Sequence, residues 1–118
     1  MKKKLREILA LDDNVQFAYL FGSYADNSFT EGSDIDIAVY FYDYSFDAKL
    51  SLHHALEKVL HKDVDMVCLN EVRNIYLLEN ILNNGMVLKD HKERDFFEVK
   101  KQHEIIDFKN FKRYIDAA

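Results

Sequence analysis

Apolar residues along the first half of the chain alternate between helical and strand-like spacing. Residues 3–13 carry leucine and isoleucine at helical intervals, which predicts a short helix. The run VQFAYLF at 15–21 is aromatic and β-branched and predicts a buried strand. Residues 34–41 (DIDIAVYF) predict a second strand, and residues 45–60 a helix that begins after Ser45, a plausible N-cap.

The second half continues the alternation. Residues 64–69 predict a third strand, and residues 71–85 predict a helix that stops at Gly85. Residues 86–90 fit either a short edge strand or an extended turn, and residues from about 92 to 116 predict a long amphipathic helix, either continuous or broken once. Helices alternating with strands predict an α/β fold, in which helices flank a small mixed β-sheet.

The composition is that of one folded domain. The chain has 118 residues, 48% of them hydrophobic, no proline, no repeat and no obvious linker. We therefore expect a single domain over residues 1–118, with its core at about 15–90 and the C-terminal helix beyond it. The aromatic residues of that helix are expected to pack onto the domain, and the alternative is that part of them meets a partner protein.

Charge and cysteine content narrow the functional classes. The net charge of −5 disfavours a direct nucleic-acid binder, because phosphate backbones require a clustered basic face. The single cysteine, Cys68, lies in an apolar context and is expected to be a buried hydrophobe. With no possible intrachain disulfide, no apolar stretch of membrane-spanning length and no secretory signal, we expect a cytoplasmic protein without membrane contact.

Two short motifs carry candidate chemistry. Gly22-Ser23 interrupts the first strand before an expected helix, and the backbone N–H groups of such a turn favour a phosphate. Asp34 and Asp36 begin the second strand in alternation with isoleucines, so their carboxylates should share one face. Like charges side by side are unfavourable unless a cation lies between them.

A third acid at the start of the third strand strengthens the metal hypothesis. If the second and third strands are neighbours, Asp65 can lie beside Asp34 and Asp36. Each repulsive pair at about 4 Å costs on the order of 1 to 4 kcal/mol, and two divalent cations would reverse that sign. Asp63 is a rival for this position, and Asp65 is favoured because apolar residues flank it on both sides.

These motifs resemble a known superfamily. Residues 22–36 (GSYADNSFTEGSDID) are similar to the Gly-Ser, ten-residue gap, Asp-x-Asp signature of polymerase-beta-like nucleotidyltransferases. FGSYA, SDIDIAV and VDMVCL look like the corresponding segments of its minimal, single-domain members. The resemblance covers residues 15–90 and implies the nucleotidyltransferase fold.

The resemblance also implies roles and a partner. Gly22 and Ser23 would hold the triphosphate of ATP, Asp34 and Asp36 would bind two Mg²⁺ ions, and Asp65 would assist one metal and the deprotonation of the attacking hydroxyl. Minimal members commonly act as antitoxins: they transfer AMP from ATP to a tyrosine of a HEPN-domain ribonuclease toxin encoded by the adjacent gene. A small-molecule acceptor and inhibition by binding alone are the alternatives.

The chain departs from the family pattern after GSYA. Many relatives have a basic residue followed by glycine, where this chain has Asp26-Asn27. A basic residue there would meet phosphate charge, so we expect weaker triphosphate binding or a substitute such as Lys49 or Arg73. Tyr24 and the tyrosines from Tyr40 to Tyr44 are expected near the site, where a ring could stack on the base.

Overall fold

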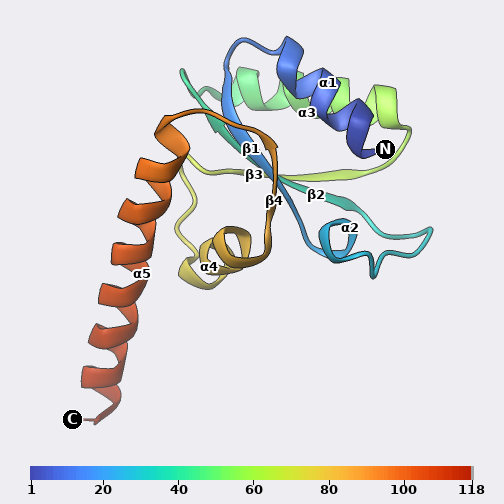
Figure 1. Ribbon diagram of the computed structural model, residues 1–118. Helices are drawn as coiled ribbons and strands as arrows, with labels where there is room; N and C mark the ends of the chain where they lie inside the picture. The colour runs from blue at the N-terminus through green and yellow to red at the C-terminus, as the bar shows by residue number, and fades with distance from the viewer. Residues whose placement is uncertain (118) are drawn as a thin grey trace.

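A computed structural model describes residues 1–117 and contains one four-stranded sheet in the order β3-β2-β1-β4 (Figure 1). The elements are α1 (Lys2–Leu11), β1 (Val15–Phe21), α2 (Ser23–Asp26), β2 (Ile35–Phe41), α3 (Phe46–Leu60), β3 (Val64–Cys68), α4 (Ile75–Asn84), β4 (Met86–Lys89) and α5 (Glu93–Ala117). Strand β1 pairs antiparallel with β2 and with β4, whereas β2 and β3 are parallel. The predicted mixed sheet flanked by helices is therefore confirmed.

Helices cover both faces of the sheet, and the alternation along β2 decides which side chains meet which layer. Ile35, Ile37 and Val39 belong to the core cluster that includes residues of α1 and α3. Ala38 belongs to the second cluster, with residues of α4 and α5. Because side chains alternate along a strand, Asp36 shares the face of Ala38, on the α4 and α5 side (Figure 1).

The structure shifts the start of one predicted helix and settles two points that the sequence left open. Helix α4 begins at Ile75 rather than at residue 71, because the Asn74 side chain accepts hydrogen bonds from the N–H groups of Tyr76 and Leu77 and caps the helix there. Residues 86–90, left open between strand and turn, contain the edge strand β4. Helix α5 is continuous over 25 residues, without the possible break.

Helix α5 packs on the domain along only part of its length. Phe97 and Ile105 are buried against the sheet and α4 cluster. The buried Tyr19 of β1 donates its hydroxyl to Glu98, which also accepts from Arg94. Beyond Ile105 the helix extends away from the sheet (Figure 1), and Phe111 is 65% exposed. The expectation that the aromatic residues pack onto the domain therefore holds for Phe97 and not for Phe111.

Within residues 1–117, no helix is both long enough and apolar enough to cross a bilayer.

Candidate active site

Gly22 makes the turn that brings the first motif against the second. Its backbone lies at φ 71° and ψ −153°, a conformation that essentially only glycine adopts, and it is the N-cap of the one-turn helix α2. A Cβ built on Gly22 would lie 2.2 Å from Oδ2 of Asp36. The glycine therefore serves two purposes: it permits the turn and leaves room for the carboxylate of Asp36.

Asp36 and Asp65 are brought together by the parallel pairing of β2 with β3. The two residues are register partners, so their side chains leave the same face of the sheet, and Asp34 lies two residues before Asp36. Asp36 is partly buried, and burial raises the pKa of its carboxyl. The negative charges of Asp65 and then Asp34 raise that pKa further. The three carboxylates are therefore electrostatic neighbours at one edge of the sheet.

The rival acid Asp63 occupies a different place. It lies just before β3, and its backbone carbonyl accepts a hydrogen bond of 3.0 Å from the N–H of Ile35. Asp63 is absent from the charges that raise the pKa of Asp36, whereas Asp65 is the larger of the two that do. The geometry thus associates Asp65 rather than Asp63 with Asp36.

This donor set suits a hard divalent cation. Three carboxylates offer only oxygen ligands, the type that Mg²⁺ prefers, and a cation would offset their mutual repulsion. Across residues 1–117, however, no three acidic, histidine or cysteine side chains are already gathered as a metal site. The three residues still fit Mg²⁺ by the chemistry of their oxygen donors and by the register that pairs Asp36 with Asp65.

The expected substitutes for a basic residue near Gly22 lie elsewhere. Lys49 is on the first turn of α3 and Arg73 follows β3, whereas Asp65 is near the amino end of that strand. Asp26 accepts hydrogen bonds from the N–H and hydroxyl of Ser28, which lower its pKa. This acid therefore closes a local turn.

Lys62 is the basic residue that the sequence reasoning missed. It lies two residues before β3 and lines, together with Asp34, a cavity of about 420 Å³. Its Nζ lies 5.9 Å from the centroid of the Tyr24 ring, so its charge lies toward the α1 and α3 side rather than beside Asp36 and Asp65. The only signal in the sequence was its position just before the third strand.

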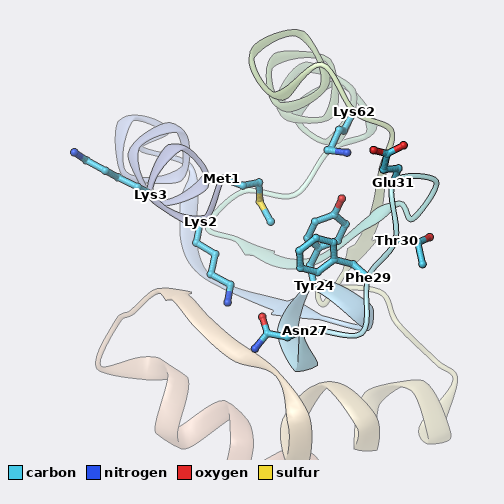
Figure 2. Close-up of a pocket in the computed structure, with 9 residues that line it drawn as sticks. All are labelled: Met1, Lys2, Lys3, Tyr24, Asn27, Phe29, Thr30, Glu31 and Lys62. Carbon is cyan, nitrogen blue, oxygen red and sulfur yellow. The ribbon is translucent and has the colours of Figure 1, made fainter.

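Tyr24 is a core residue rather than a base-stacking one. Its ring is 3% exposed, belongs to the cluster on the α1 and α3 side, and stacks on Phe29 with centroids 4.4 Å apart. A cavity of about 800 Å³ lies on this side, lined by Tyr24, Phe29, Lys62 and the first turn of α1 (Figure 2). The sheet thus separates this cavity from the face on which Asp36 and Asp65 lie, and the base-stacking expectation for Tyr24 is wrong.

A glycine turn against paired strand aspartates, on a mixed sheet flanked by helices, defines the polymerase-beta-like nucleotidyltransferase class. The family model described as "Polymerase beta, Nucleotidyltransferase" matches residues 3–94. The chain belongs to this family.

Individual relatives agree with this assignment. The chain is 40% identical over 87 residues to a Methanocaldococcus jannaschii protein named provisionally as a protein adenylyltransferase, covering 73% of this chain and 91% of that protein. It is 33% identical over 98 residues to the protein adenylyltransferase MntA of Shewanella oneidensis, covering 79% of this chain and 70% of MntA.

Solved structures resemble nearly the whole chain. A toxin–antitoxin structure with AMP-PNP matches with a TM-score of 0.83 at 28% identity, covering 98% of this chain and 95% of that chain. A complex of a tri-AMPylated Shewanella oneidensis HEPN toxin with its MNT antitoxin matches with a TM-score of 0.76 at 28% identity, covering 98% and 92%.

Proposed function

We propose that this protein is an Mg²⁺-dependent adenylyltransferase that transfers AMP from ATP to a tyrosine hydroxyl of a HEPN-domain toxin and thereby acts as its antitoxin. The observation that carries the proposal is the Gly22 turn lying against Asp36, which is the register partner of Asp65 and follows Asp34 by two residues. The relatives support ATP as the nucleotide and a HEPN toxin as the acceptor. One relative is named a protein adenylyltransferase, and one similar structure contains an AMPylated HEPN toxin.

The residues of the site have different roles in AMP transfer. The Gly22-Ser23 turn holds the triphosphate, because glycine allows the phosphates to approach the backbone N–H groups closely. The acceptor oxygen attacks the α-phosphorus, an O–P bond forms, the bond between the α- and β-phosphates breaks, and pyrophosphate leaves. The phenolic proton passes to Asp65, since a tyrosine with a pKa of about 10 is a poor nucleophile while protonated.

Asp34, Asp36 and Asp65 also supply the ligands for metal. Two Mg²⁺ ions bound there would supply a more acidic attacking oxygen and support for the leaving pyrophosphate.

Mass spectrometry of the acceptor tests the proposal directly. The purified chain is mixed with ATP, Mg²⁺ and the HEPN-domain protein encoded by the adjacent gene, and AMP additions are counted on that protein. We expect Asp36→Asn and Asp65→Asn each to reduce transfer by about a hundredfold or more. The matched variant Asp63→Asn, at the neighbouring acid, should transfer AMP at nearly the normal rate.

Two outcomes contradict the proposal in different ways. Toxin inhibition that needs no ATP and survives Asp36→Asn would show that the protein acts by binding alone. AMP transfer to a small molecule but not to the HEPN protein would show that the chain is a nucleotidyltransferase whose acceptor is not the toxin.

A further inference from the structure

The apolar side of α5 continues beyond the part of the domain on which it packs. Phe97 and Ile105 are buried, and Phe108 is 38% exposed with its ring edge against Tyr76 of α4, centroids 6.0 Å apart. One turn further along the helix, Phe111 is 65% exposed, and two turns further, Ile115 is 53% exposed. The helix therefore carries the same kind of side chain past the last element that could cover it.

These side chains form one surface, which we call the terminal apolar face: Tyr76, Phe108, Phe111, Tyr114 and Ile115. Residues of α5 three and four positions apart are neighbours on the helix surface, so the four members on α5 adjoin one another. Tyr76 and Tyr114 are 51% and 73% exposed. Large apolar groups gathered on an exposed surface in this way mark an interaction site.

The helix is held in place without a partner. Lys109 forms an ion pair with Glu79 of α4, and Nζ of Lys112 donates a 3.0 Å hydrogen bond to the hydroxyl of Tyr76. These contacts anchor α5 at the level of the terminal apolar face. A partner would therefore meet a preformed surface and would lose little affinity to ordering the helix.

The family match does not extend over most of this helix, although its first half completes the core of the domain. The match to the nucleotidyltransferase family ends at residue 94, one residue after α5 begins. The toxin–antitoxin structures, in contrast, match 98 and 99% of this chain, a share that includes most of the 25 residues of α5. The similarity to these toxin–antitoxin structures thus extends over α5, beyond the residues that the family model matches.

The position of α5 relative to the carboxylates indicates which partner fits. Helices α4 and α5 lie on the face of the sheet to which Asp36 belongs (Figure 1). A partner protein bound to α5 therefore lies on the side of the sheet where Asp36 and Asp65 would act on a tyrosine hydroxyl of that partner. A protein bound through α1 or α3 would face the opposite side.

We propose that the terminal apolar face is the docking surface for the HEPN-domain toxin, through an apolar patch on that protein. This inference rests on the proposed function, because it assigns the toxin as the acceptor. Binding through α5 separates recognition from chemistry: the helix holds the acceptor protein while the carboxylates act on one of its tyrosines.

Affinity measured without ATP tests the surface independently of catalysis. The HEPN-domain protein encoded by the adjacent gene is immobilised, and binding of the full-length chain is compared for the natural sequence, Phe111→Glu and Phe46→Glu. Phe46 is a matched control, since it is 67% exposed but lies on α3, on the opposite side of the sheet. We expect Phe111→Glu to weaken binding about thirtyfold or more, as loss of a central aromatic contact does, and Phe46→Glu to change it less than about twofold.

Thermal unfolding of each variant confirms that the domain stays folded, and Ile115→Glu provides a second substitution on the same face. Equal affinity of the natural chain and both α5 variants would overturn the inference while leaving the AMP-transfer result untouched. Conversely, loss of binding in the α5 variants with no AMP transfer by the natural chain would refute the proposed function alone. A natural chain that self-associates through this face, while toxin binding survives Phe111→Glu, would assign the surface to a second copy and overturn the inference.

Discussion

Replacing Gly22 by alanine tests the geometry of the site most directly. The backbone at φ 71° and ψ −153° costs a residue with a Cβ about 1 to 3 kcal/mol, because this region is essentially restricted to glycine. The new methyl group would also lie 2.2 Å from Oδ2 of Asp36, far inside van der Waals contact. Either the turn or the carboxylate must move.

The two effects predict separate measurements. Urea unfolding of Gly22→Ala should show a free energy of unfolding lower by about 1 to 3 kcal/mol. A displacement of the Asp36 carboxylate by about 1 Å should reduce AMP transfer by about a hundredfold, since catalysis depends on such alignment. The rate should therefore fall further than the loss of folded protein explains.

Gly32→Ala is the matched control. Gly32 lies between the two motifs, and a Cβ there would meet nothing within 4 Å. Its free energy of unfolding should stay the same or rise by up to about 1 kcal/mol, because alanine restricts the unfolded chain. Transfer of AMP should be unchanged.

A double-mutant cycle separates backbone strain from the contact with Asp36. Asp36→Ala removes the atoms nearest to the added methyl group, so Gly22→Ala should cost less stability in that background. An equal cost in both backgrounds would show that Asp36 is not the group displaced. If Gly22→Ala unfolds and transfers AMP like the natural chain, the reasoning about this turn is wrong.

Two further predictions concern the metal and the anchoring of α5. Millimolar Mg²⁺ should raise the thermal unfolding midpoint of the natural chain, because the cation binds the folded state. The midpoint of Asp36→Asn should rise only slightly. Equal shifts in the two proteins would show that the cation binds elsewhere. Tyr19→Phe should lower the free energy of unfolding by about 1 to 3 kcal/mol, because Glu98 loses the partly buried 2.5 Å hydrogen bond from the tyrosine hydroxyl. Urea unfolding measures this change, and no loss of stability would show that Arg94 alone satisfies Glu98.

Much of the local structure could be predicted from the spacing of apolar residues. The order of helices and strands follows from it, because a buried strand and an amphipathic helix need different periods. Some boundaries were missed: α1 ends at Leu11 rather than at residue 13, and the start of α4 is set by a single contact. Helix α4 begins at Ile75 because Asn74 caps it, and a cap is one side-chain hydrogen bond that the apolar spacing does not record.

The candidate site was only partly predictable. Gly22, Ser23, Asp34, Asp36 and Asp65 stand out in the sequence, and whether they act in catalysis remains for the variants above to decide. Lys62 has no motif around it, and its relevance comes from sharing a cavity with Asp34. Tyr24 lies two residues from Gly22 in sequence, yet the short helix α2 turns its ring to the other side of the sheet.

The helices and strands of this protein, and the acids that could hold a cation, can be identified from the sequence because both depend on residue type and short-range spacing. Which of these residues are neighbours depends on the tertiary structure. Parallel pairing of β2 with β3 places Asp65 rather than Asp63 next to Asp36, and the turn at Gly22 brings its backbone against the same carboxylate. The fold also leaves the end of α5 uncovered, since exposure depends on where the neighbouring elements end and not on the helix's own residues.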